Sequence, residues 1–123
     1  METKKRKPHK IELAGVEVEV NFSLASLFYL TEKHSDLPKF LELVSGTGKS
    51  AGERMNSTFI TAVAELVYAG LFKPDDNGDD TSGWSVPRVM RSIHPMDLGA
   101  ISSEVLAAWT DGGQKNPPQA ANP

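Results

Sequence analysis

The stretch from residue 62 to residue 72 (AVAELVYAGLF) constrains the fold of this 123-residue chain most, because Glu65 is its only charged side chain. A helix that is apolar on nearly all sides must be covered by other elements on more than one of them. The apolar spacing begins earlier and predicts a helix over residues 51–72, at the centre of the core. Gly70 is the expected C-terminal cap of this helix, and Pro74 follows it. The apolar stripe consists of Met55, Phe59, Ala62, Val63, Leu66, Val67 and Gly70.

Residues 9–22 alternate apolar and polar side chains, which predicts a β-hairpin. Alternation of β-branched with charged residues is typical of half-buried strands. A two-residue loop at Ala14 and Gly15 would bring the aliphatic side chains of both strands to one face, and Gly15 would supply the positive φ of a tight turn. Ala14 is not a preferred turn residue, so a bulged loop is the alternative. The two-residue loop would pair Leu13 with Val16, Ile11 with Val18 and His9 with Val20.

Helical periodicity predicts four more helices. Ser23, Asp36 and Ser85 are suited to cap three of them, and the glycine pair at 112–113 is expected to end the last. The predicted fold class is α+β and mostly helical, with an N-terminal hairpin packed on a bundle of four to five helices in a single domain over residues 9–111. The four helices cover about residues 23–33, 36–45, 86–93 and 95–110. One face of the first contains Leu24, Leu27, Phe28 and Thr31.

The charge is divided unequally along the chain. Residues 1–10 hold five basic side chains and one acidic one, net +4, whereas the remaining 113 residues hold 8 basic and 15 acidic ones, net −7. We predict a flexible basic arm at residues 1–8 and a disordered, proline-rich tail at residues 112–123. The acidic body argues against nucleic-acid binding through the whole surface. The arm could bind nucleic acid or serve as a nuclear-localisation signal, although a solvated tail is the favoured interpretation.

The composition also limits the chemistry and the compartment. The chain contains no cysteine, which excludes disulfides, thiolate zinc sites and cysteine nucleophiles. No apolar run approaches the ~18 residues of a transmembrane helix, and the basic N-terminal residues do not lead into the apolar region of a signal peptide. We therefore expect a soluble, intracellular protein with no membrane partner.

Two polar loops superficially match ligand-binding motifs. Residues 45–52 (SGTGKSAG) look like the end of a phosphate-binding loop, but Leu43 occupies the place of the first glycine and the preceding segment is helical. In residues 75–83 (DDNGDDTSG), an EF-hand calcium loop would require ligands where Lys73 and Trp84 stand. Solvated loops are therefore favoured, and we expect no cofactor and no metal.

The sequence shows no cluster of catalytic side chains and no helix with side chains that could recognise DNA base edges. The three histidines, His9, His34 and His94, lie far apart, and Glu65 has no partner at helical spacing. Residues 96–110 contain no Lys, Arg, Asn or Gln, so a helix-turn-helix around His94 would have no side chain to read base edges. We therefore expect a protein that is not an enzyme and for which nucleic-acid binding is disfavoured.

Apolar side chains at the margins of the predicted helices favour protein binding. Aromatic residues are enriched at protein interfaces, and several here lie near helix ends instead of within a stripe. The hypothesis is that five residues border a partner-binding surface, and the alternative is that they pack in the core. These residues are Phe28, Tyr29, Leu71, Phe72 and Trp109.

Three segments together resemble the tail assembly chaperones of long-tailed bacteriophages: IELAGVEVEV at 11–20, FSLASLFYLTE at 22–32 and AELVYAGL at 64–71. The similarity covers about residues 9–110. The resemblance implies a non-enzymatic protein of the host cytoplasm that binds the hydrophobic tape measure protein and is absent from the finished virion. It also implies a longer, frameshifted form that recruits the tail tube protein, for which codons 114–116 could supply the slippery run. Self-association is a further possibility, because small helical chains with surplus apolar stripes often cover them in this way.

A second class of function stays open at this point. The chain could be a small intracellular adaptor or regulator, associated with nucleic acid through its basic arm. The gene neighbourhood separates the two classes, because a long tape measure gene just downstream supports a chaperone. A salt-sensitive gel shift that is lost on deletion of residues 1–8 supports the adaptor.

Overall fold

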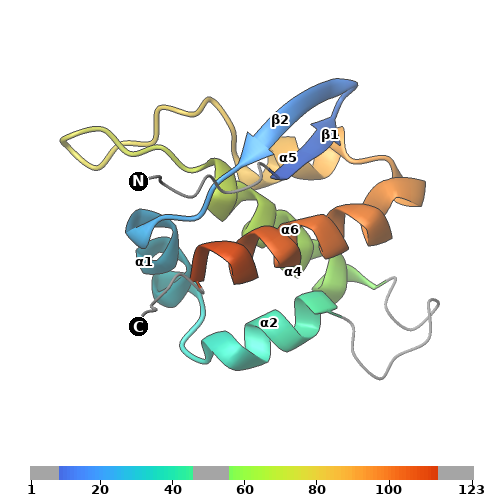
Figure 1. Ribbon diagram of the computed structural model, residues 1–123, viewed down its shortest axis with the longest axis horizontal. Coiled ribbons are helices and arrows are strands. Elements are labelled where there is room, and N and C mark those ends of the chain that lie inside the picture. Colours follow the sequence, from blue (N-terminus) through green and yellow to red (C-terminus); the bar gives the residue numbers. More distant parts are fainter. Residues whose placement is uncertain (1–8, 46–55, 114–123) are drawn as a thin grey trace, which may run out of the picture.

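The computed structural model describes residues 9–45 and 56–113 (Figure 1). The predicted basic arm, most of the loop at 45–52 and the tail beyond residue 113 lie outside the described residues. The predicted α+β, mostly helical class is confirmed. An antiparallel hairpin of β1 (His9–Leu13) and β2 (Val16–Val20) precedes the helices. These are α1 (Leu24–Lys33), α2 (Leu37–Ser45), α4 (Ser57–Leu71), α5 (Val86–Ser92), the 3₁₀ turn η1 (Pro95–Asp97) and α6 (Leu98–Gly113).

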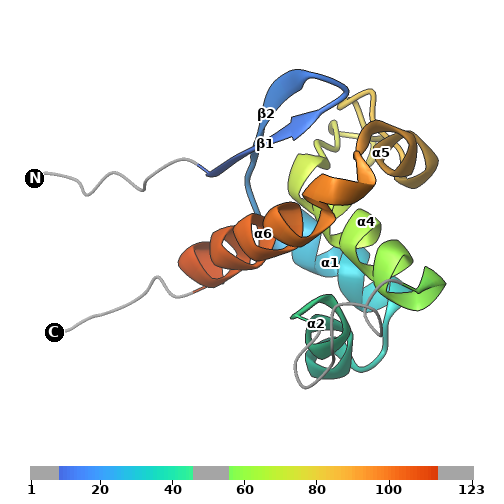
Figure 2. The same ribbon diagram turned by 90° about the vertical axis from the view of Figure 1, so that its right-hand side faces the viewer.

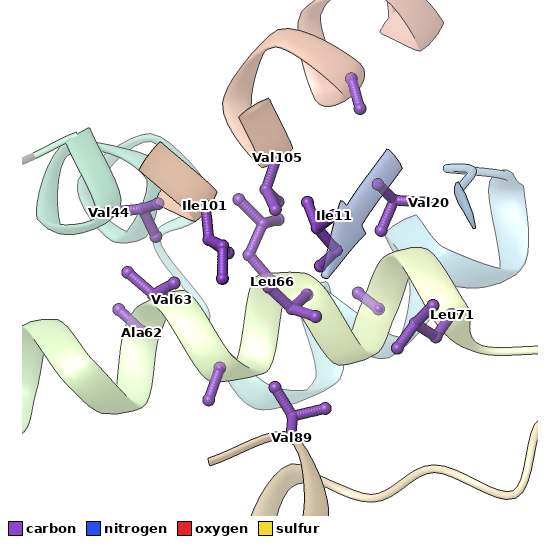
Figure 3. Close-up of a cluster of buried hydrophobic side chains, with 14 of the residues drawn as sticks. Ile11, Val20, Val44, Ala62, Val63, Leu66, Leu71, Val89, Ile101 and Val105 are labelled. Atoms are coloured by element: carbon purple, nitrogen blue, oxygen red, sulfur yellow. The ribbon is translucent and has the colours of Figure 1, made fainter. Parts of the chain in front are cut away.

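Helix α4 lies among the other helices and the hairpin (Figure 1 and Figure 2), as its composition predicts. Nine of its 15 residues are buried, and it contacts α1, α2, α5, α6 and β2. Figure 3 shows side chains from the hairpin, α2, α5 and α6 converging on it. Asn56 caps the helix, because its side chain accepts the Phe59 N–H at 2.9 Å. Helix α4 therefore begins at Ser57, and residues 51–55 of the predicted helix lie outside the described residues.

The structure gives Gly70 a role different from the predicted one. It lies inside α4, which ends one residue later at Leu71, so it is not the C-terminal cap. The hairpin crosses the helix here, and a Cβ on Gly70 would lie 2.6 Å from Val20 Cγ1 and 3.1 Å from Phe22 Cζ. The Asn21 N–H also donates to the Gly70 carbonyl at 2.9 Å. A glycine is needed at this position because the strand passes so close to the helix.

The hairpin has the predicted two-residue loop and register, with Leu13 opposite Val16 and His9 opposite Val20. Ala14 has φ 54° and Gly15 has φ 80°, so both turn residues are left-handed, which is the pattern of a type I′ turn and not of a bulged loop. The buried side chains of this hairpin, Ile11, Leu13 and Val20, face the helices. At the turn, Val16 is 58% exposed, although Leu13 opposite it is fully buried and the Ala14 N–H donates to the Ser92 carbonyl at the end of α5.

The remaining helices follow the predicted caps with one difference at the C-terminal end. Ser85 accepts the Arg88 N–H, and Asp36 accepts the Lys39 N–H at 3.1 Å. Helix α6 continues to Gly113, although the sequence predicts an end near residue 110. Glycine lowers helix stability by only about 1 kcal/mol per residue and does not forbid the conformation. No helix within residues 9–45 and 56–113 is long and apolar enough to cross a membrane.

Candidate protein-binding surface

Helix α1 turns two large apolar side chains towards solvent. Leu24 is 79% exposed and Phe28 is 65% exposed, and their i, i+4 spacing places them one above the other on the helix surface. We call this pair the α1 outer row. On the opposite side, Ser26 and Leu30 are fully buried. The face predicted from the spacing of Leu24, Leu27, Phe28 and Thr31 is therefore the outer side of α1, where only Leu27 is half-buried.

The N-terminal cap explains how a serine can be buried while a phenylalanine is exposed. Ser23 and Ser26 form a reciprocal capping box, in which the Ser26 N–H donates to Ser23 Oγ and the Ser23 N–H donates to Ser26 Oγ at 3.1 Å. The hydroxyl of Ser26 thus has a partner, which removes the main penalty for burying it. A small side chain at this position lets α1 lie close to the core.

Contacts on its inner side hold α1 in this orientation. Tyr29 packs edge-on against Tyr68 of α4, with ring centroids 5.1 Å apart, and against Phe72 at 5.6 Å. Just after the end of α1, His34 Nε2 lies 2.7 Å from Glu65 Oε1 of α4. Rotating α1 to bury its outer row would break both sets of contacts.

The five predicted partner-binding residues fall into different places. Phe28 is the most exposed of them and belongs to the α1 outer row. Tyr29 and Phe72 are half-buried in one aromatic cluster. Trp109 is half-buried against Phe22, edge-on with ring centroids 5.2 Å apart. Leu71 is only 5% exposed and belongs to the core, so it cannot border a surface here.

Sequence reasoning missed Leu24, the most exposed side chain of α1. The available signal was its position four residues before Phe28, directly after the N-terminal cap. It also missed the partner of Glu65, because His34 lies 31 residues away in the chain. His34 additionally stacks on Phe40, with ring centroids 4.1 Å apart. The His34–Glu65 pair links the end of α1 to α4, and the Phe40 ring packs against the His34 imidazole.

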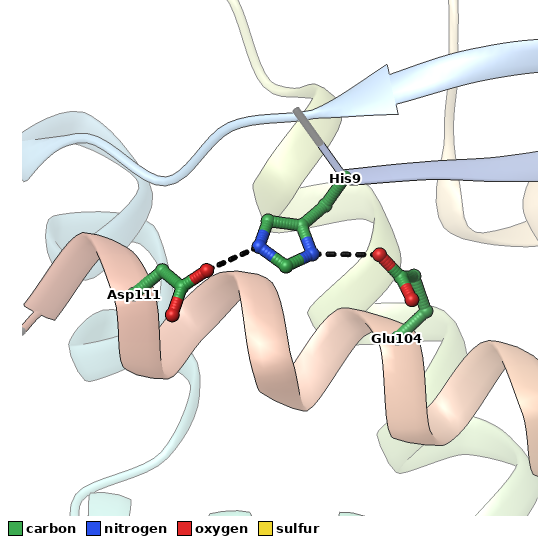
Figure 4. Close-up of polar contacts among 3 residues, drawn as sticks. All are labelled: His9, Glu104 and Asp111. Carbon is green, nitrogen blue, oxygen red and sulfur yellow. Dashed lines mark hydrogen bonds and ion pairs between the residues drawn. The ribbon is translucent and has the colours of Figure 1, made fainter. Parts of the chain in front are cut away.

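A second carboxylate–histidine contact joins the hairpin to α6 (Figure 4). His9 Nδ1 lies 2.6 Å from Glu104 Oε2, and His9 Nε2 lies 2.5 Å from Asp111 Oδ2. Both ring nitrogens can donate only when the imidazole is protonated. The hydrogen bond with Asp111 raises the pKa of His9 above 6.5, burial opposes the rise, and Glu104 adds to it. The protonated form of His9 can therefore donate to both carboxylates and link β1 to α6.

The acidic loop after α4 is organised by its own carboxylates. Asp80 accepts hydrogen bonds from Tyr68 Oη at 2.7 Å, the Lys73 N–H at 2.9 Å and the Ser82 N–H at 3.0 Å. Burial alone would raise the pKa of Asp80, but these hydrogen bonds outweigh it and lower the pKa below 3.8. Within the described ranges, no group of three or more His, Cys, Asp or Glu side chains is arranged to hold a metal ion.

Comparison of the chain with protein-family models, with curated proteins and with solved structures finds no match. The function proposed below therefore depends on the residues of the surface and on the resemblance of the three segments.

Proposed function

We propose that this chain is a non-enzymatic tail assembly chaperone of a long-tailed bacteriophage, which binds the hydrophobic tape measure protein in the host cytoplasm. The observation that carries the proposal is the α1 outer row, because a chaperone that holds an apolar chain needs apolar side chains available to it. The three resembling segments support it as well. They form the hairpin, α1 and the end of α4, and α4 contacts both β2 and α1.

The size of the outer row suits a reversible contact. Full burial of a leucine or phenylalanine side chain contributes about 1.5–3 kcal/mol, so the exposed parts of Leu24 and Phe28 offer on the order of 2–4 kcal/mol to a partner. One such contact gives weak binding on its own. A long apolar partner that presents many similar segments would be held by repeated contacts and released as the tail assembles.

Co-expression with the candidate tape measure protein tests the proposal. We expect a larger soluble fraction of that protein with the wild-type chain, and a smaller one with the double variant Leu24→Ala/Phe28→Ala. Met96→Ala is the matched control, because Met96 is 84% exposed on η1, outside the outer row. The proposal fails if the tape measure protein is no more soluble with the chain than without it.

The implied longer form has its own test. A programmed frameshift requires a slippery heptamer near codons 114–116 and an overlapping reading frame beyond them. Expression of the unmodified gene should then give two products that share their N-terminal peptides in mass spectrometry. The longer product, and not the shorter one, should co-purify with the tail tube protein. A single product from the natural gene would contradict this part of the proposal.

A further inference from the structure

We infer that the α1 outer row docks one amphipathic helix of a different protein, in which basic side chains flank the apolar ones. This inference deepens the proposed function and rests on it in so far as the tape measure protein supplies that helix. Two helices that cross at a short apolar row make contact over about one turn of each. An i, i+4 pair on a ten-residue helix is sufficient for such a crossing.

Segments of this chain outside the described ranges are poor occupants of the row. Among residues 1–8, 46–55 and 114–123, only Met1 and Met55 have large apolar side chains. Neither has a second large apolar residue three or four positions away within its segment. These segments therefore offer no apolar row that matches the spacing of Leu24 and Phe28.

A second copy of the chain is also a poor occupant. Full burial of an aromatic side chain covers about 150–250 Å², so the two exposed side chains together offer on the order of 250 Å² per copy. Two outer rows facing each other would bury on the order of 500 Å², whereas stable interfaces bury about 1,200–2,000 Å². The area fits a weak complex with a helix better than a stable dimer.

Charge defines the chemistry of the partner. The chain carries 13 basic and 16 acidic side chains, so its net charge is −3. On α1 itself, Glu32 is exposed four residues after Phe28 and continues the outer row. The ammonium group of Lys33 instead lies over the ring of Tyr29, at 5.9 Å. An approaching helix with Lys or Arg beside its apolar residues would place a cation next to Glu32 at the end of the row.

Designed peptides test the surface without the natural partner. The probe is a fluorescein-labelled helical peptide of about 18 residues with leucines at i, i+3, i+4 and i+7 and lysines beside them. Its matched controls are the same peptide with glutamates in place of the lysines and a scrambled peptide of identical composition. In fluorescence anisotropy, the wild-type chain should bind both control peptides at least about tenfold more weakly than the lysine peptide. The variant Leu24→Ala/Phe28→Ala should bind the lysine peptide at least about tenfold more weakly than the wild type does. Met96→Ala should leave the affinity unchanged.

Charge reversal distinguishes docking at this row from general attraction between a basic peptide and an acidic protein. Glu32→Lys should weaken binding of the lysine peptide and strengthen binding of the glutamate peptide. The inference is overturned if the double alanine variant or Glu32→Lys binds both peptides as the wild type does. It is also overturned if sedimentation velocity shows a dimer that the double alanine variant loses. Row-dependent binding to vesicles of phosphatidylcholine and phosphatidylglycerol would likewise overturn it, because the occupant would then be a lipid surface.

The two proposals can fail separately. If the peptide binds at the outer row but the tape measure protein is not solubilised, the surface stands and the proposed function fails. If the tape measure protein is solubilised equally by the wild type and by Leu24→Ala/Phe28→Ala, the function stands and the docking surface lies elsewhere.

Discussion

Replacing Gly70 with alanine tests how closely the hairpin approaches α4. The added methyl group would lie 2.6 Å from Val20 Cγ1, whereas carbon atoms pack at about 3.5–4.0 Å. Overpacking of this kind costs about 1–3 kcal/mol, and the better helix propensity of alanine offsets at most about 1 kcal/mol of it. We therefore expect Gly70→Ala to lower the free energy of unfolding by about 1–2 kcal/mol.

A double-mutant cycle assigns this loss to the contact with Val20. Val20→Ala removes Cγ1, so Gly70→Ala should cost less in that background, with a coupling of about 1 kcal/mol. Urea unfolding followed by far-UV circular dichroism measures all four proteins. Gly99→Ala is the matched control in α6, because its added Cβ would have no atom within 4 Å besides its chain neighbours and the backbone of its own helix. It should be neutral, or stabilising by up to about 1 kcal/mol.

Two results would refute this reasoning. In the first, Gly70→Ala is as stable as the wild type and behaves like Gly99→Ala, so the strand moves aside without cost. In the second, Gly70→Ala is destabilised by the same amount with and without Val20→Ala. The glycine would then matter for the backbone near the helix end, as the sequence predicts, and not for the approach of the hairpin.

Three further predictions concern stability. The pKa of His9 is raised in the folded state, so its contribution of about 0.5–1 kcal/mol to the free energy of unfolding is complete below about pH 6.5 and is lost as the pH rises through the folded-state pKa. In urea unfolding, wild type and His9→Gln should differ at about pH 5.5 and converge at about pH 9. A difference that stays constant with pH would contradict this. The pKa of Asp80 is lowered in the folded state, so its contribution to stability is present above about pH 4 and is lost as the pH falls through the folded-state pKa. Asp80→Asn should lower the free energy of unfolding by about 1–3 kcal/mol at neutral pH and by less in acid. An equal loss at both pH values would rule out the ionised carboxylate as the cause. Leu24→Ala/Phe28→Ala should change the free energy of unfolding by less than about 0.5 kcal/mol per site, whereas Leu30→Ala should cost about 2–5 kcal/mol, and similar losses would show that the outer row is part of the core.

Much of the fold could be predicted from local patterns. The alternation in residues 9–22 predicts the pairing of Leu13 with Val16 because side chains of a strand point alternately to its two faces. Ser23 and Ser85 mark helix starts correctly, since a side-chain oxygen can replace the missing backbone acceptor at a helix N-terminus. The apolar composition of residues 62–72 likewise predicts a helix covered on several sides.

The candidate surface was only partly predictable. The sequence predicts Phe28 and Leu71 at one partner-binding surface, but Phe28 is exposed on the outer side of α1 and Leu71 is buried in the core. A helical wheel identifies which residues share a face, but it does not say which face meets the rest of the protein. That choice depends on the sum of all contacts made by α1, including the packing of Tyr29 on α4.

The sequence by itself determined the elements of this protein, their order and the register of the hairpin, because backbone hydrogen bonds, caps and side-chain periodicity act between residues close in the chain. Only the tertiary structure decided that Ser26 is buried and Phe28 exposed, that Gly70 is a contact point, and that His9 meets Glu104 and Asp111. His9 lies 95 and 102 residues from these two partners. Contacts of this kind form only after the helices and the hairpin have packed together, so no local pattern encodes them.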